Sequence, residues 1–159
     1  MKTAHKFILI IMAIFMMGFV VIPAHASDAK YLSVKGGGVL MDPKQPGIRT
    51  TFVVTLERQI DLPSKAFVEV SFENPSDKTN PLIASQIVDK KQTTFQIESP
   101  EVTGIADNTA YAVQVSVYKN ESKKKLLTQV DTTIQSLISE DTLRQKVRES
   151  RAEKEEQAL

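Results

Sequence analysis

Hydrophobic and polar residues alternate with a period of two along much of the chain, most clearly in residues 110–118. Apolar side chains occupy the odd positions from Tyr111 to Val117, whereas the even positions from Ala112 to Tyr118 are mostly small or polar. Successive side chains of a strand point to opposite faces, so this period is typical of a strand with one buried face. We therefore predict a central β-strand here.

Six further apolar segments of strand length are separated by residues typical of turns. The predicted strands cover residues 31–41, 51–56, 67–72, 82–88, 93–98 and 126–134. No helical period interrupts them, which predicts an antiparallel sandwich of two sheets around one core. In the last strand, Leu126, Val130 and Ile134 are expected to share the buried face.

Residues 36–38 are three consecutive glycines inside the first predicted strand. Glycine within a strand often marks a bulge, or a place where another group approaches the backbone closely. We expect a bulge or bend where this strand crosses between the sheets. The alternative is a close approach by a ligand or by another part of the backbone.

The turn before the central strand has a distinctive composition, with Ile105 six residues ahead of Tyr111 and an Asp107-Asn108-Thr109 turn between them. This segment resembles the corner of fibronectin type III domains, in which a Leu, a Pro-Gly-Thr-type turn and a Tyr precede an alternating strand. Asn108 takes the Gly position, since Asn also tolerates a left-handed backbone.

The resemblance implies a seven-stranded, antiparallel, immunoglobulin-like sandwich, in which Ile105, Asn108 and Tyr111 have structural roles. It also implies that the Tyr111 hydroxyl bonds back to the chain a few residues upstream. The chain departs from the family in lacking the Trp of the second strand, so Phe52 or Val54 would have to fill that space.

The pattern changes after residue 138, where Ser139 precedes two acids. Ser is a favourable helix cap, and acids stabilise the first turn through the helix dipole. Only Leu143 and Val147 form an apolar stripe. We predict a sandwich domain over residues 27–138 and a charged tail over residues 139–159, which is either helical or disordered. The alternative is a helix that docks a partner through Leu143 and Val147.

The first 26 residues have the features of a secretory signal peptide. Lys2 and Lys6 precede a nearly unbroken apolar run over residues 7–22, and Ala24 and Ala26 supply a small-residue cleavage site. The run is short for a bilayer, which needs roughly 20 apolar residues, although an uncleaved anchor is the alternative. We predict cleavage after Ala26, a periplasmic or secreted bacterial protein, and no stable membrane insertion afterwards.

Composition restricts the chemistry of the exported chain. Both histidines, His5 and His25, lie in the predicted signal peptide, and there is no cysteine. A Ser-His-Asp triad, a cysteine nucleophile and a histidine zinc site are therefore excluded after cleavage. We predict that the protein is not an enzyme and uses no cofactor or metal.

Three weaker candidates for a catalytic or metal site occur in the sequence. Adjacent residues Ser64 and Lys65 point in different directions and make a poor catalytic pair. Glu69 and Glu73 share a strand face with Ser71, which indicates a solvated surface. Asp77 alone offers too few carboxylates for a calcium ion.

Lysines concentrate in residues 59–65, 89–92 and 119–125, three segments that would form loops at one end of a fibronectin-like sandwich. Such a cluster recruits anionic partners by raising the encounter rate, whereas the alternative is that the lysines only keep the loops soluble. Aromatic residues for base stacking are missing, so no nucleic-acid partner is expected. The candidate partner-binding residues are Lys65, Lys90, Lys91, Lys119, Lys123, Lys124 and Lys125.

These features predict an exported, non-enzymatic binding or adaptor domain of the cell envelope. Its expected partner is a protein or an anionic envelope polymer. The alternative is a structural subunit that self-assembles through an exposed sheet edge, either Leu82–Val88 or the glycine-rich first strand. A second alternative is a hydrolase that uses two carboxylates. It would need two acids that face each other across a cleft.

Overall fold

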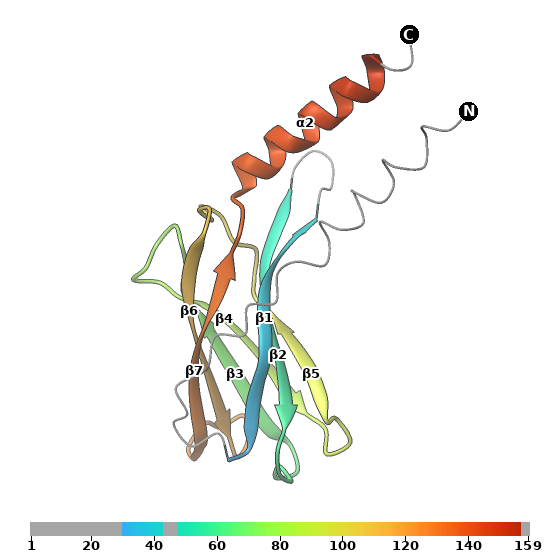
Figure 1. The fold of residues 1–159 in the computed structure, drawn as a ribbon. Helices are drawn as coiled ribbons and strands as arrows, with labels where there is room; N and C mark the ends of the chain where they lie inside the picture. Colours follow the sequence, from blue (N-terminus) through green and yellow to red (C-terminus); the bar gives the residue numbers. More distant parts are fainter. Residues whose placement is uncertain (1–29, 43–47, 157–159) are drawn as a thin grey trace, which may run out of the picture.

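A computed structural model describes residues 30–42 and 48–156 of the chain (Figure 1). The predicted signal peptide, residues 1–26, lies outside the described residues. Within residues 30–42 and 48–156, seven strands are followed by one helix. The elements are β1 (Leu32–Asp42), β2 (Arg49–Arg58), β3 (Ala66–Phe72), β4 (Leu82–Val88), β5 (Thr94–Glu98), β6 (Thr109–Tyr118), β7 (Leu126–Ser136) and α2 (Glu140–Glu156).

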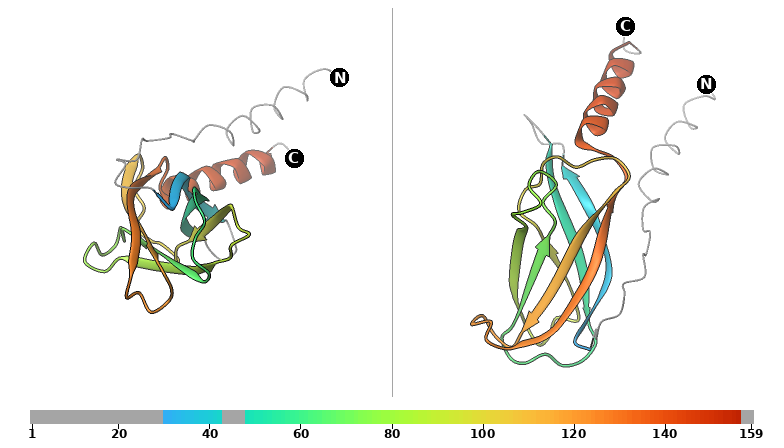
Figure 2. Two further views of the ribbon diagram at one scale, coloured as in Figure 1. Left: turned by 90° about the horizontal axis from the view of Figure 1, so that it is seen from below. Right: turned by 90° about the vertical axis from the view of Figure 1, so that its left-hand side faces the viewer.

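The strands form two sheets that pack face to face (Figure 2). One sheet has the order β1-β2-β5 and the other β4-β3-β6-β7, and every paired strand is antiparallel. The predicted seven-stranded antiparallel sandwich is therefore confirmed. Each predicted strand is present, with its ends displaced by two residues at most.

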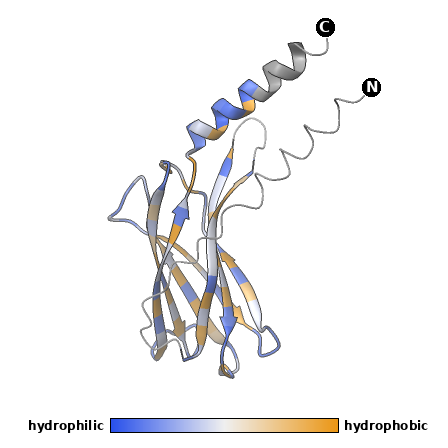
Figure 3. Cartoon of the chain, viewed as in Figure 1, coloured by the Kyte–Doolittle hydropathy of each residue, from blue (hydrophilic) through white to orange (hydrophobic). Residues whose placement is uncertain are grey.

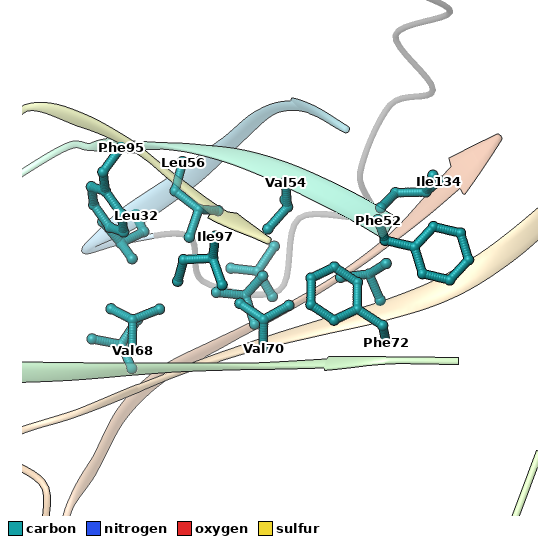
Figure 4. Close-up of a cluster of buried hydrophobic side chains, with 14 of the residues drawn as sticks. Leu32, Phe52, Val54, Leu56, Val68, Val70, Phe72, Phe95, Ile97 and Ile134 are labelled. Atoms are coloured by element: carbon teal, nitrogen blue, oxygen red, sulfur yellow. The ribbon is translucent and has the colours of Figure 1, made fainter. Parts of the chain in front are cut away.

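Alternation of side chains along the strands builds a single core between the sheets. The inward residues of β3 are completely buried, and those of β6 almost so. Phe52 stacks on Phe72 with ring centroids 6.0 Å apart, and its centroid lies 5.2 Å from that of Tyr111. Figure 4 shows the two phenylalanines together in this core. Phe52 and Val54 are both fully buried in this core.

The glycines of β1 coincide with an irregularity in its pairing. The register with β2 shifts between Val34 and Gly36, which confirms the predicted bulge. The expected crossing between sheets is wrong, because β1 pairs only within the three-stranded sheet. Gly37 also permits a close approach, because a Cβ atom there would lie 2.8 Å from Ile134 Cγ1 on β7. The glycine segment therefore lets β1 pack tightly beside β7.

The start of β7 corrects one prediction, because Leu126 does not share the buried face of Val130 and Ile134. A bulge shifts the register between Val117 and Tyr118, so that Leu126 pairs with Tyr118 and is 48% exposed. Leu127 packs against the core instead. One extra residue reverses the alternation of every side chain on that side of the bulge.

The tail contains helix α2, which begins where the sequence predicted. The Ser139 Oγ accepts a hydrogen bond from the Thr142 N–H at 3.2 Å, as a helix cap does. The helix extends away from the strands (Figure 1), and its described side chains are largely hydrophilic (Figure 3). Within the described part of the chain, no helix is long and apolar enough to cross a membrane.

Candidate binding surface

The corner before β6 has the geometry that its sequence predicts. The Ala106 N–H donates a hydrogen bond of 2.8 Å to the Tyr111 hydroxyl, five residues downstream. Asn108 has a φ angle of 48°, in the left-handed region that Asn tolerates, and Ile105 is buried. These three residues hold the start of β6 against the core.

Asp107 links this corner to helix α2, a role that the sequence analysis missed. Its carboxylate accepts hydrogen bonds from the Ser139 N–H and, at 3.0 Å, from the Thr142 hydroxyl. The Ser139 N–H is the main reason that the pKa of Asp107 lies below its usual value.

Three loops meet at the end of the sandwich opposite α2, at the bottom of Figure 1. They connect β2 to β3, β4 to β5 and β6 to β7, and antiparallel strand order brings them to the same end. The Arg58 guanidinium donates to the Lys90 carbonyl, which ties the first two loops together. We call this region the lysine end. Its exposed lysines are Lys65, Lys90, Lys91, Lys119, Lys123, Lys124 and Lys125.

Lys123 differs from the other six lysines because it is held by the outer face of the sheet. Its ammonium pairs with the Glu69 carboxylate and lies 5.6 Å from the Phe67 ring centroid. The remaining six make no ion pair in the described structure. Their charges are therefore available to a partner.

The acids of the lysine end leave this positive charge largely uncompensated. Asp61, Asp89 and Glu121 are exposed in the same loops. The Asp89 carboxylate accepts a hydrogen bond of 2.9 Å from the Lys91 N–H, so it shapes its own turn. Six free lysines against three acids give this end a net positive charge.

An apolar row crosses the outer face of the four-stranded sheet beside the lysine end. Strand register aligns Ile87, Phe67, Tyr118 and Leu126, one residue from each of β4, β3, β6 and β7. Ile87 and Leu126 are nearly half exposed, and the two aromatic residues are partly buried. The sequence analysis did not find this row, because only the register shows that the four residues are neighbours.

The two acids considered for a hydrolase are occupied separately. Glu69 pairs with Lys123. Glu73 pairs with Lys78 at 3.0 Å and accepts a hydrogen bond of 2.9 Å from the Ala112 N–H. That N–H is the main reason that the pKa of Glu73 is lowered. Glu69 therefore connects β3 to the loop between β6 and β7, and Glu73 connects the end of β3 to β6.

Asp77, the residue considered for calcium, shapes its own loop. Its carboxylate accepts hydrogen bonds from the Thr79 hydroxyl at 2.7 Å and from the Thr79 N–H at 3.0 Å. These bonds, the hydroxyl first, lower the pKa of Asp77. No group of three or more His, Cys, Asp or Glu residues that could hold a metal ion occurs among the described residues.

Comparison with known proteins leaves the surface to be interpreted from its own geometry. No protein-family model matches the chain, and no curated protein matches its sequence. The features that an interpretation must explain are the lysine end and the apolar row beside it.

Proposed function

We propose that this protein is an exported, non-enzymatic binding or adaptor domain of the bacterial cell envelope. The observation that carries the proposal is the group of six unpaired lysines on three adjoining loops. Its partner carries clustered negative charge, as a phosphorylated envelope polymer or an acidic protein surface does. Export rests on the signal-peptide pattern of residues 1–26.

We further propose that the sandwich is of the fibronectin type III kind. Support comes from the sheet orders β1-β2-β5 and β4-β3-β6-β7, which place the loops as in that fold. The hydrogen bond between Tyr111 and Ala106 provides the second support. Domains of this kind present ligand-binding loops on a rigid scaffold, which agrees with a binding role.

The charges of the lysine end favour an anionic partner over a solubilising role alone. A lysine ammonium is a mobile point charge, so a cluster of lysines adapts to phosphate groups or carboxylates at variable spacing. Elsewhere in the described sandwich, Lys35, Arg49 and Lys78 each form an ion pair with a glutamate. Concentration of unpaired lysines at one end therefore creates a directional attraction.

Binding to two soluble probes tests this proposal. The purified protein is titrated with inorganic polyphosphate, which represents a phosphorylated polymer, and with poly-L-glutamate, which represents an acidic protein. The test variant is Lys124→Glu with Lys125→Glu. Lys123 stays unchanged because its pair with Glu69 supports the sheet. We expect affinity for one probe to fall roughly tenfold or more, and to fall with added salt.

A matched control carries Lys146→Glu and Arg148→Glu on α2, at the opposite end of the molecule. It changes the net charge equally and should bind as the unaltered protein does. Equal losses in both variants would show attraction by overall charge and would overturn the assignment to the lysine end. Unaltered protein that binds neither probe would overturn it as well.

Export has its own test in the host cell. Edman sequencing of the accumulated protein should begin at Ser27, the residue after the predicted cleavage site. A protein that retains its first residues in the cell interior would contradict the envelope assignment. Crosslinking in intact cells would then identify the natural partner of the correctly exported protein.

A further inference from the structure

Strand β4 forms an exposed edge of the four-stranded sheet. It pairs with β3 on one side and is the outermost strand of its sheet. Its seven residues contain no charge, no proline and no glycine. Charged side chains and proline usually protect an edge strand from pairing with another chain. Because β4 has neither, it presents an unprotected row of backbone donors and acceptors.

The other three described edges are better protected. β1 and β7 lie side by side, so these two edges cover each other. β5 is short, and its exposed positions are polar, with Glu98 paired to Arg49 at 3.2 Å. Pairing with another strand is therefore favoured at β4.

The outward face of β4 is symmetric about Ser85. Ile83 and Ile87 lie two residues before and after it and are 45% and 46% exposed. If two copies of β4 align antiparallel about Ser85, Ile83 of each copy lies opposite Ile87 of the other. A self-complementary pattern of this kind is what a two-fold interface requires.

Charges at the two ends of β4 favour the same arrangement. Asp77 lies in the loop before β4, where Lys78 is already paired with Glu73. Asp89, Lys90 and Lys91 follow the strand, so this end carries one net positive charge. Antiparallel pairing brings the acidic start of one copy to the basic end of the other. Parallel pairing would place the lysines of both copies together, which is unfavourable.

We propose that two copies of this protein associate through β4, paired antiparallel about a two-fold axis at Ser85. The association joins the two four-stranded sheets into one continuous sheet. It also extends the apolar row, because Ile87 at its end meets Ile83 of the other copy. Main-chain hydrogen bonds provide the attraction, and the isoleucine pairs set the register. This inference does not depend on the proposed anionic partner.

A charge-swap experiment at Ser85 tests the symmetry directly. The purified protein is expected to sediment as a dimer. Ser85→Lys places two ammonium groups opposite each other at the axis, and Ser85→Glu does the same with two carboxylates. Each variant alone should therefore be a monomer, whereas an equimolar mixture should form a mixed dimer, because the unlike charges then meet.

Thr133→Lys and Thr133→Glu provide matched controls on the exposed face of β7, and both should remain dimers. Circular dichroism must show the same strand content in every variant. A monomeric unaltered protein, a dimer that persists in Ser85→Lys, or a mixture that stays monomeric would each overturn the proposal. Oligomers larger than dimers would also overturn it, since one edge per chain closes the assembly.

Discussion

Tyr111 makes two interactions of different kinds. Its ring packs on Phe52 in the core, and its hydroxyl accepts the Ala106 N–H at the corner. The first interaction depends on shape and the second on one oxygen atom. A substitution can therefore separate them.

Removal of that oxygen in Tyr111→Phe should destabilise the fold by about 1–2 kcal/mol, because the corner N–H loses its partner while the ring packing remains. Urea denaturation measures the change. Tyr118→Phe is the control, because this ring lies on the outer face, and its effect should stay within about 0.5 kcal/mol. Equal effects of the two substitutions would show that the corner hydrogen bond contributes nothing specific.

Gly37 and Gly38 are neighbours with different surroundings. A Cβ at Gly37 would lie 2.8 Å from Ile134 Cγ1 and 3.1 Å from the Val53 carbonyl oxygen, whereas a Cβ at Gly38 meets no atom within 4 Å. Gly37→Ala should cost about 1–3 kcal/mol through overpacking. Gly38→Ala should be neutral or stabilise by up to about 1 kcal/mol.

Denaturant unfolding of both alanine variants measures this difference. In an Ile134→Ala background the effect of Gly37→Ala should shrink, because the clashing side chain is gone. If the cost stays unchanged in that background, the tight packing of β1 against β7 is not its cause.

At the scale of elements, α2 is attached to the sandwich through the Asp107 carboxylate. Ser139 and Thr142 both donate hydrogen bonds to it, at the helix end where the dipole favours negative charge. The corner that positions β6 therefore also sets where α2 begins. Asp107 is exposed, so bulk solvent can protonate its carboxylate directly.

The attachment of α2 should weaken in acid. The folded-state pKa of Asp107 lies below its ordinary value, so its contribution is fully present above that ordinary value. It is lost as the pH falls through the lower folded-state pKa. NMR chemical shifts of residues 140–145 should report a loss of helix over this acidic range.

Asp107→Asn should remove most of that acid-dependent change, because the amide does not titrate. Asp61→Asn, at the lysine end, is the control and should leave the change intact. If Asp107→Asn retains the full pH dependence, other acids in the first turn, such as Glu140 and Asp141, are responsible.

For the whole molecule, the core and the proposed partner-binding surface occupy separate regions. The core lies between the two sheets, the lysine end carries unpaired charge, and α2 extends from the opposite end. A hydrophilic helix that points away from the sheets adds little buried apolar area. It should therefore contribute little to the stability of the sandwich.

A chain that stops after Thr142 tests this separation, because it keeps both hydrogen bonds to Asp107 and removes most of α2. Its free energy of unfolding should lie within about 1 kcal/mol of that of the full chain. The comparison uses urea denaturation monitored by tyrosine fluorescence. A much larger loss would mean that α2 packs against the sandwich or against a second copy.

The sequence predicted features that depend on local chemistry. Apolar segments of strand length, several of them alternating and all bounded by turn residues, located every strand. Asn108 indicated the left-handed turn, and Ser139 indicated the start of α2. In each case the residue itself carries the conformational preference that the structure uses.

Other features depend on which residues meet across the chain. Leu126 was wrongly placed in the core, because a bulge follows from pairing between strands and leaves no mark in the alternation of one strand. The Asp107 contact with α2 and the apolar row likewise join residues that are distant in sequence.

The sequence by itself therefore determined the strands, the two-sheet class, the corner and the lysine-rich loops, because periodicity and turn chemistry act over a few residues. The strand register, the identity of the unpaired lysines and the choice of β4 over the glycine-rich first strand as the unprotected edge became clear only from the fold. These properties arise from contacts between segments, and a contact depends on how two sheets twist and pack together rather than on either segment alone.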